Sequence, residues 1–201
     1  MTSLIAGCSY QVGVVTHTFP QLSMSGSYVY TTKQAQHLQA ILSLLSYFDT
    51  LCEDKQLEYV ICGNTLLGAL RHDGFIPWLD YVTVEMRDTE IERLHRTCKG
   101  LAEIKQTRSG CIFRVKGVTL EVLAVTTCPH TELRIYTDPA LTQQYPNYRN
   151  SYTDIHPRRR AVFENISLWM PQESELLCRR LFGATCFTTA VLPSRSRGLF
   201  R

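Results

Sequence analysis

The chain has 201 residues, of which 44% are hydrophobic and 19% are charged, and its formal net charge is +3 at pH 7. This composition is typical of one globular domain and excludes a disordered or membrane-embedded chain. The small positive charge permits weak anion binding, but specific nucleic-acid binding usually needs a concentrated basic face, so we expect none. No apolar run is long enough to span a membrane, and the first residues do not form a signal peptide pattern.

Eight cysteines are scattered along the chain. None belongs to a Cys-x-x-Cys pair, and no His/Cys group has the spacing of zinc ligands. Free, largely buried thiols in an intracellular (cytoplasmic) protein explain this scatter better than disulfides do.

The predicted elements begin with an extended N-terminal arm, residues 1–31, which is rich in Ser, Thr, Gly and aromatic residues. Thr32 to Cys52 carries an apolar stripe at three- and four-residue steps, which predicts a core-packing helix with Thr32 as its N-cap. Tyr59 to Cys62 is predicted to be a strand, Thr65 to Leu70 a short helix, and Tyr81 to Val84 a second strand.

A second helix is predicted over Asp88 to Leu101, where Thr89 and Glu92 have the spacing of a capping box. Glycine turns then separate several short β-prone runs, which predict an antiparallel meander. These runs are residues 102–107, 111–116 and 118–125, and residues 132–137 could add another strand.

Residues 138–160 are predicted to be a polar loop that ends in three consecutive arginines, Arg158 to Arg160, and such a run is more often solvated than ligand-binding. A single strand over residues 162–170 and a final helix over residues 174–182 follow. The pattern predicts one domain over residues 32–186 and an exposed basic tail over residues 187–201.

The most ordered stretch is Tyr59 to Met86, with the sequence YVICGNTLLGALRHDGFIPWLDYVTVEM. It resembles the signature of the LicD family, the phosphocholine transferases and their fukutin-related relatives, whose usual form is approximately GTLLGxxRHxGFIPWDDDIDI. The matching residues are Thr65 to Gly68, Arg71, His72, Gly74 to Trp78 and Asp80. The C-terminal part is similar to the family's ending at Met170-Pro171, Glu175 to Leu177 and Leu181 to Gly183.

The resemblance implies an α+β fold, a nucleotidyltransferase-like mixed β-sheet flanked by helices, in agreement with the predicted order of elements. Active members of that fold bind nucleotide phosphates with a glycine-rich turn. They hold Mg²⁺ or Mn²⁺ with two carboxylates two residues apart on one strand and a third on a neighbouring strand. The metal neutralises the phosphates and activates the attacking oxygen.

Two of the three expected metal ligands are changed in this chain, because the strand positions hold Tyr81 and Thr83. A phenol and an aliphatic hydroxyl are poor ligands for hard cations. Glu121 is the candidate for the third carboxylate. Asp80 remains, but strand alternation turns it to the other face, and Glu85 lies on the Tyr81 and Thr83 face. With Asp88, these residues could replace the lost ligands only after a register shift or a bulge.

The substrate-binding turn would be Gly63, Asn64 and Thr65, in which Asn64 replaces the family's second glycine. Arg71 could bind a phosphate or hold the loop, and His72 could act as a general acid–base or as a loop-locking donor. With the metal carboxylates absent, the structural role is favoured for both.

The leading hypothesis is therefore a pseudoenzyme, a structural or interaction module that needs no metal or cofactor. It would bind protein partners through the N-terminal arm and the basic tail, in a setting that could include a large assembly such as a virus particle. The alternative is a divergent transferase, dependent on Mg²⁺ or Mn²⁺, that moves a nucleotidyl or phosphocholine-like group to a glycan or similar acceptor. A third hypothesis is a sugar-phosphate binder that uses Arg71 and the arginine run without chemistry.

Overall fold

The structure is a computed structural model that describes residues 31–188 in full. Outside that range it describes only five short strands, which form a two-stranded sheet, β1 with β13, and a three-stranded sheet in the order β3-β2-β4. Their bounds are β1 Ser3–Leu4, β2 Ser9–Val12, β3 Val15–Thr18, β4 Tyr28–Val29 and β13 Ala190–Val191. The predicted arm and tail fall mostly outside the described residues, so their roles stay predictions.

The centre of the fold is a six-stranded sheet in the order β5-β6-β9-β8-β7, in which β10 extends the pairing of the long strand β9. β6 and β9 run parallel, and the other neighbours in this sheet are antiparallel. The bounds are β5 Val60–Ile61, β6 Thr83–Arg87, β7 Glu103–Thr107, β8 Gly110–Val115, β9 Val118–Thr127 and β10 Arg134–Tyr136. This mixed sheet with its helices confirms the predicted α+β class.

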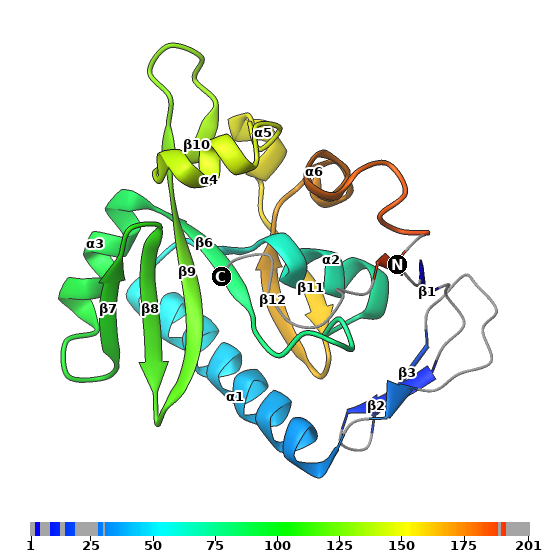
Figure 1. Cartoon of the computed structure of the whole chain (residues 1–201). Helices are drawn as coiled ribbons and strands as arrows, with labels where there is room; N and C mark the ends of the chain where they lie inside the picture. The colour runs from blue at the N-terminus through cyan, green and yellow to red at the C-terminus, as the bar shows by residue number, and fades with distance from the viewer. Residues whose placement is uncertain are drawn as a thin grey trace.

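Two helices, α1 (Thr32–Lys55) and α3 (Asp88–Thr97), pack on one face of the sheet (Figure 1). The predicted apolar stripe of α1 is buried, and most polar residues of the helix are exposed on its other side. Phe48 of α1 meets the rings of Tyr59 and Phe113 edge-on at 5.3 and 5.1 Å between centroids. Burial of such aromatic side chains supplies much of the stabilising free energy of a core.

The ends of both helices differ from the predicted ones. The N-cap of α1 is Thr31 and not Thr32, since the Thr31 hydroxyl accepts from the Gln34 N–H and the Gln34 side chain accepts in return from the Thr31 N–H. α3 starts directly after β6 with no side-chain cap, so the capping box predicted at Thr89 and Glu92 does not form.

The predicted loop over residues 138–160 contains two short helices, α4 (Pro139–Gln144) and α5 (Tyr152–Ile155). Local capping explains them. The Asp138 side chain accepts from the Ala140 N–H, and Ser151 forms a capping box with Asp154. Caps of this kind stabilise helices too short to show an apolar period.

The predicted single strand over residues 162–170 is instead a hairpin of β11 (Arg159–Phe163) and β12 (Ile166–Met170), followed by the confirmed helix α6 (Ser174–Phe182). Glu164 sits in the turn with a φ of 56°. The hairpin brings Arg160, the last residue of the arginine run, into ion pairs with Asp49 at 2.7 Å and with Glu53 at 3.0 Å. The prediction of a solvated arginine loop is therefore wrong for this residue.

Helix α2 (Gly63–His72) and the loop after it form one packed unit that explains the glycines of the central stretch. A Cβ on Gly68 would overlap the carbonyl oxygen of Gly74, and a Cβ on Gly74 would overlap the Glu164 side chain. Glu164 also accepts a hydrogen bond from the Phe75 N–H at 3.0 Å. The loop is thus fixed between α2 and the β11–β12 hairpin.

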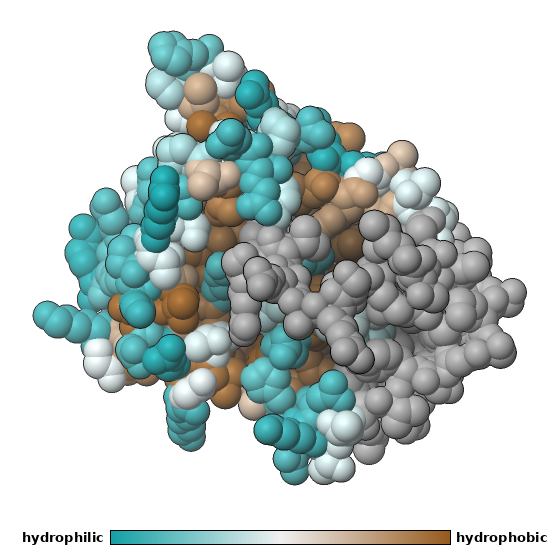
Figure 2. Space-filling view, viewed as in Figure 1, coloured by the Kyte–Doolittle hydropathy of each residue, from teal (hydrophilic) through white to brown (hydrophobic). Residues whose placement is uncertain are grey.

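Polar side chains project from the face seen in Figure 2, and the apolar residues lie set back between them. Within the described part of the chain, no helix is both long and apolar enough to cross a membrane. The seven cysteines of this part, all except Cys8, are free thiols.

We predict that Gly68→Ala lowers the free energy of unfolding by about 1–3 kcal/mol, the usual cost of overpacking, because the added methyl group overlaps the Gly74 carbonyl. Chemical denaturation measures the loss. Gly117→Ala is the control, since its Cβ enters open space at a φ of 81° and reports backbone strain alone. An unchanged or higher free energy of unfolding in Gly68→Ala would contradict the steric explanation.

Candidate functional site

The candidate site lies on the face of the sheet that α1 does not cover, where β6 and β9 run side by side. Their register pairs Thr83 with Glu121 and Glu85 with Leu123. Because side chains alternate along a strand, Thr83, Glu85 and Glu121 project to the same face. The N-terminus of α2 meets this face at Thr83.

Three hydrogen bonds attach the start of α2 to Thr83. The Thr83 N–H donates to the Thr65 hydroxyl at 2.8 Å, and the Thr83 hydroxyl donates to the Cys62 carbonyl at 3.2 Å. The Cys62 N–H donates to the Thr83 carbonyl at 3.3 Å. Gly63 follows with a φ of 53°, a left-handed conformation that glycine adopts without a steric penalty. The predicted turn at Gly63 to Thr65 is therefore bonded to Thr83, the strand position at which the resemblance implies a carboxylate.

Tyr81 also turns toward the start of α2, where its hydroxyl accepts a hydrogen bond from the Asn64 amide at 2.6 Å. The two changed positions, Asn64 for glycine and Tyr81 for a carboxylate, thus form one contact. Asp80 has an exposed side chain, and its carbonyl oxygen lies 3.2 Å from the His37 ring. The structure brings Tyr81 into the site and leaves the Asp80 carboxylate outside it.

Glu121 is the carboxylate that remains beside Thr83. Its side chain is half-buried, and burial raises the pKa of its carboxyl group. Burial also raises the pKa of the Tyr145 phenol, and the charges of Tyr81 and Glu121 add to the rise. A carboxyl group with a raised pKa is the kind of group that exchanges protons in general acid–base catalysis.

Glu85 is the next residue of β6 on the same face, and it is fully buried. It accepts a hydrogen bond from the Tyr148 hydroxyl and lies 3.2 Å from the Arg134 guanidinium. Burial raises the pKa of Glu85, and the charge of Arg134 partly offsets the rise. Glu85 is thus held in a structural pair and does not replace a metal ligand.

The residues that enclose Glu85 were not among the predicted site residues. They include Arg134 and Tyr148. Tyr148 stacks on Tyr136 at 4.0 Å between ring centroids, and Tyr136 meets the Tyr145 ring edge-on. The tyrosine-rich stretch after β10 was the available signal, but it had been predicted to be a polar loop.

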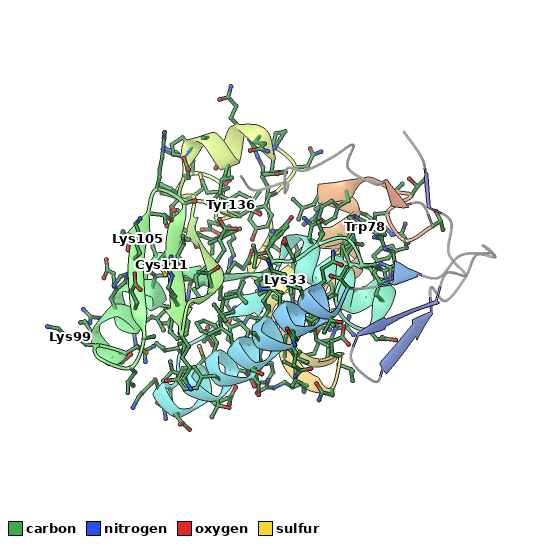
Figure 3. The ribbon with its side chains drawn as sticks, turned by 60° about the horizontal axis from the view of Figure 1, so that its bottom comes forward. Lys33, Trp78, Lys99, Lys105, Cys111 and Tyr136 are labelled. Carbon is green, nitrogen blue, oxygen red and sulfur yellow. The ribbon has the colours of Figure 1, made fainter. Side chains whose placement is uncertain are left out.

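Arg71 and His72 lie at the other end of α2, about 12 Å from Gly63 at the helical rise of 1.5 Å per residue. Both are buried. The Arg71 guanidinium donates to the His72 ring at 2.9 Å and to the Cys186 carbonyl at 2.9 Å, and it lies over the Trp78 ring. Trp78 is on the opposite side of the molecule from Lys99 and Lys105 (Figure 3). The contacts of Arg71 described above join the end of α2 to Trp78 and Cys186. Ligand binding by Arg71 or His72 stays a prediction.

The side chains of the site do not fit the divalent metal that the family fold implies. Tyr81 is bonded to Asn64, the Thr83 hydroxyl is bonded to a backbone carbonyl, and only Glu121 offers a carboxylate. Asp88, exposed at the start of α3, lies beyond the far end of β6. Among the described residues, no group of three or more His, Cys, Asp or Glu side chains could hold a metal ion.

Comparison with known proteins relates the chain to one protein family and to two individual proteins. Residues 56–173 match the family described as LicD/FKTN/FKRP, nucleotidyltransferase domain. The chain is 48% identical over 52 residues to the lipopolysaccharide cholinephosphotransferase LicD of Haemophilus influenzae, a match that covers 26% of this chain and 20% of that protein. It is 22% identical over 178 residues to the uncharacterized protein RP689 of Rickettsia prowazekii, covering 86% of this chain and 65% of that protein.

The chain thus aligns with less than two thirds of the length of either relative. The family match spans more than half of the chain and contains α2, β6 and β9, the elements that build the candidate site. The chain belongs to the LicD family.

Proposed function

We propose that the chain is a divergent transferase domain that moves a phosphocholine or nucleotidyl-type group to a hydroxyl group of a glycan or similar acceptor. The observation that carries this proposal is the Glu121 carboxylate beside Thr83, on the strand face that meets the start of α2. The similarity to a lipopolysaccharide cholinephosphotransferase supports the substrate class.

Each side chain of the site has a role in this proposal. The N-terminus of α2 favours a phosphate group, because the helix dipole places partial positive charge there. The pair of Asn64 and Tyr81 closes the site above β6 and orients the ligand. Glu121 accepts the proton of the acceptor hydroxyl as that oxygen attacks the phosphorus of the transferred group. The pyrophosphate P–O bond of the nucleotide-linked donor breaks in the same step, and the nucleoside monophosphate leaves with the electron pair.

No step of this proposal passes through a metal ion, since the ligand set does not fit one. In the family's chemistry a bound metal neutralises the phosphates and activates the acceptor. A metal ion contributes several kcal/mol to the transition state, and each 1.4 kcal/mol is about tenfold in rate. A transferase that lacks it is therefore expected to be slow.

The same substitutions favour a second candidate function, a pseudoenzyme that serves as an interaction module. The specific observation is that the Tyr81 and Thr83 hydroxyl groups are both engaged in internal hydrogen bonds. In this case the fold is kept and transfer is lost. Partners bound through the termini, and assembly into a virus particle, stay predictions.

The transferase proposal predicts that Glu121→Gln abolishes transfer while ligand binding remains, because the amide cannot accept the proton. The assay is release of the free nucleotide from a choline-linked nucleotide donor, with binding followed by calorimetry. Since burial raises the pKa of Glu121 above its ordinary value of 4.5, the wild-type rate should rise with pH through a pKa above 4.5.

Glu103→Gln is the control for this prediction. Glu103 is an exposed carboxylate on the outer strand β7, and the change removes the same charge. A wild-type chain that binds no donor and shows no turnover, with or without Mg²⁺ or Mn²⁺, would overturn the transferase proposal and leave the interaction module.

A restored site gives a separate prediction. β6 begins at Thr83, so Tyr81 lies just before the strand, whereas the sequence had predicted it on the strand. Tyr81→Asp combined with Thr83→Asp should still create Mg²⁺ or Mn²⁺ affinity, because it adds two carboxylates, one at the register partner of Glu121 and one at the residue that contacts the start of α2. Without metal the double variant should melt at a lower temperature than the wild type, since a charge at the fully buried Thr83 position faces the Cys62 carbonyl. Added metal should restore the melting temperature.

The matched control is Tyr81→Asn combined with Thr83→Asn, which has the same shape without the charge. Its melting temperature should not respond to metal. A metal response equal in both double variants, or absent from the aspartate variant, would contradict the alignment of Tyr81 and Thr83 with the family's metal ligands.

A further inference from the structure

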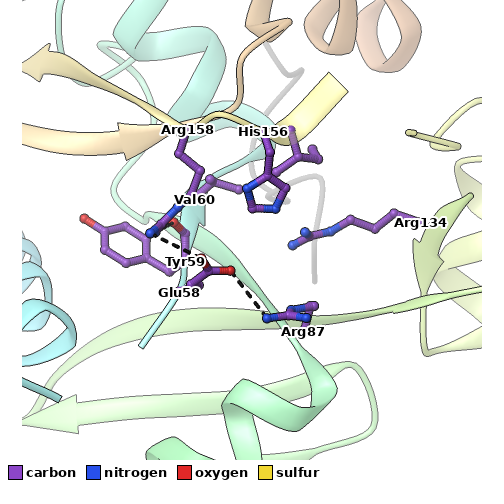
Figure 4. Close-up of a pocket in the computed structure, with 8 residues that line it drawn as sticks. Glu58, Tyr59, Val60, Arg87, Arg134, His156 and Arg158 are labelled. Atoms are coloured by element: carbon purple, nitrogen blue, oxygen red, sulfur yellow. Dashed lines mark hydrogen bonds and ion pairs between the residues drawn. The ribbon is translucent and has the colours of Figure 1, made fainter. Parts of the chain in front are cut away.

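A small recess of about 10 Å³ lies at the end of β6 away from Thr83. Arginine and histidine side chains from three segments of the chain converge on it (Figure 4). They are Arg87 at the end of β6, Arg134 of β10, His156 after α5 and Arg158 before β11. Glu58, just before β5, is the acidic residue of its wall.

The Glu58 carboxylate neutralises only part of this charge. It lies 3.4 Å from the Arg87 guanidinium and 3.6 Å from the Arg158 guanidinium, so that one anion serves two cations. Its side chain is 42% exposed and can swing into solvent. The charge of the Arg134 guanidinium is neutralised by the carboxylate of the buried Glu85. The three guanidinium groups outnumber these two carboxylates, so the recess keeps a net positive charge.

Arg134 also has an unused donor. Its Nε–H is buried and has no hydrogen-bond partner within the described part of the chain. A buried N–H without an acceptor costs free energy, which an incoming acceptor would recover. Burial first, and then the charges of the three arginines, lower the pKa of His156 against the opposing charge of Glu58.

Part of the arrangement has a structural purpose. Arg158 donates to the Tyr59 carbonyl at 3.0 Å and stacks on the Trp169 ring at 4.6 Å. Its other terminal nitrogen faces Glu58. Arg87 has a side chain that is 52% exposed and an ion pair with Glu58 alone among the described residues. Packing thus accounts for the position of Arg158 but not for that of Arg87.

We propose that this recess binds the phosphate group of a phosphate-bearing ligand, with Arg87, Arg134 and Arg158 as donors. Guanidinium groups match phosphate oxygens in geometry and charge. The Glu58 carboxylate occupies the position of the phosphate until the ligand displaces it. A small soluble ester and a lipid headgroup both carry this chemistry.

The phosphate recess is distinct from the candidate transferase site. Thr83 and Arg87 are four residues apart on β6, which is about 13 Å at the rise of a strand. The buried Glu85 and its partners lie between them. The two sites can therefore be tested independently.

The experiment is calorimetric titration of the full chain with inorganic pyrophosphate, with the fold of each variant checked by thermal unfolding. Arg87→Gln should weaken binding roughly tenfold, the usual effect of one charge-assisted hydrogen bond. Arg114→Gln is the matched control, because Arg114 forms an equivalent exposed cross-strand pair with Glu103 at 3.3 Å. Equal weakening in both variants, or no saturable binding by the wild type, would overturn the proposal.

Glu58→Gln gives the opposite sign and cannot be explained by a general loss of folding. It removes the competing internal carboxylate and should tighten pyrophosphate binding several-fold, whereas Glu103→Gln should not. Unchanged or weaker binding in Glu58→Gln would contradict the displacement of Glu58. Arg134 is left intact in these tests, since its removal would strand the buried charge of Glu85.

Vesicles separate the two sources of phosphate. If the ligand is a lipid headgroup, vesicles that contain phosphatidic acid should bind the wild type more tightly than Arg87→Gln, and pure phosphatidylcholine vesicles should bind neither. If it is a soluble ester, pyrophosphate should bind and the phosphatidic acid vesicles should not. Failure of both ligands to distinguish the wild type from Arg87→Gln would overturn the phosphate recess.

Discussion

The fold depends on the junction between the start of α2 and the first residue of β6. Thr83 uses its N–H, its carbonyl and its hydroxyl to hold Thr65 and Cys62. Because Thr83 is fully buried, each of these polar groups would cost free energy if it were left unpaired. A metal-binding carboxylate at this position must face a cation, whereas threonine satisfies the same backbone without one. The substitution therefore keeps the geometry of the junction and changes its chemistry.

The second constraint is the buried charge of Glu85. It is held between the Tyr148 hydroxyl and the Arg134 guanidinium, which come from the segment after β9. Breaking a buried pair leaves an uncompensated charge and is strongly destabilising. Glu85 thus ties β10 and the Tyr148 segment to the sheet. It also holds the guanidinium of Arg134, a residue that lines the recess at the end of β6.

The sequence predicted the α+β class, the long helix, the central strand–helix–strand order and the terminal helix because each has a strong apolar period or a clear glycine or proline boundary. It failed over residues 138–160, where side-chain caps at Asp138 and Ser151 decide the backbone. It also failed at the β11–β12 turn, because Glu164 adopts a positive φ without glycine. Gly63, Asn64, Thr65, Tyr81 and Thr83 were predicted from one local motif, because they lie within a single short stretch of the chain. Glu121 lies outside that stretch and was predicted only as the match to the family's third carboxylate. Arg134 and Tyr148 were not among the predicted site residues, because pairing between distant segments brings them to β6 and the tyrosine-rich stretch after β10 does not specify that pairing.

The two proposals rest on different kinds of residue and so differ in what each needs. At the α2–β6 junction the hydroxyl groups of Tyr81 and Thr83 are satisfied internally, and only Glu121 has a perturbed carboxyl group available for chemistry. At the recess the donors outnumber their acceptors, since Glu58 serves two guanidinium groups and the Nε–H of Arg134 has no acceptor among the described residues. An excess of donors favours the binding of an anion and requires no reaction. Loss of metal chemistry at the first site would therefore leave phosphate recognition at the second intact.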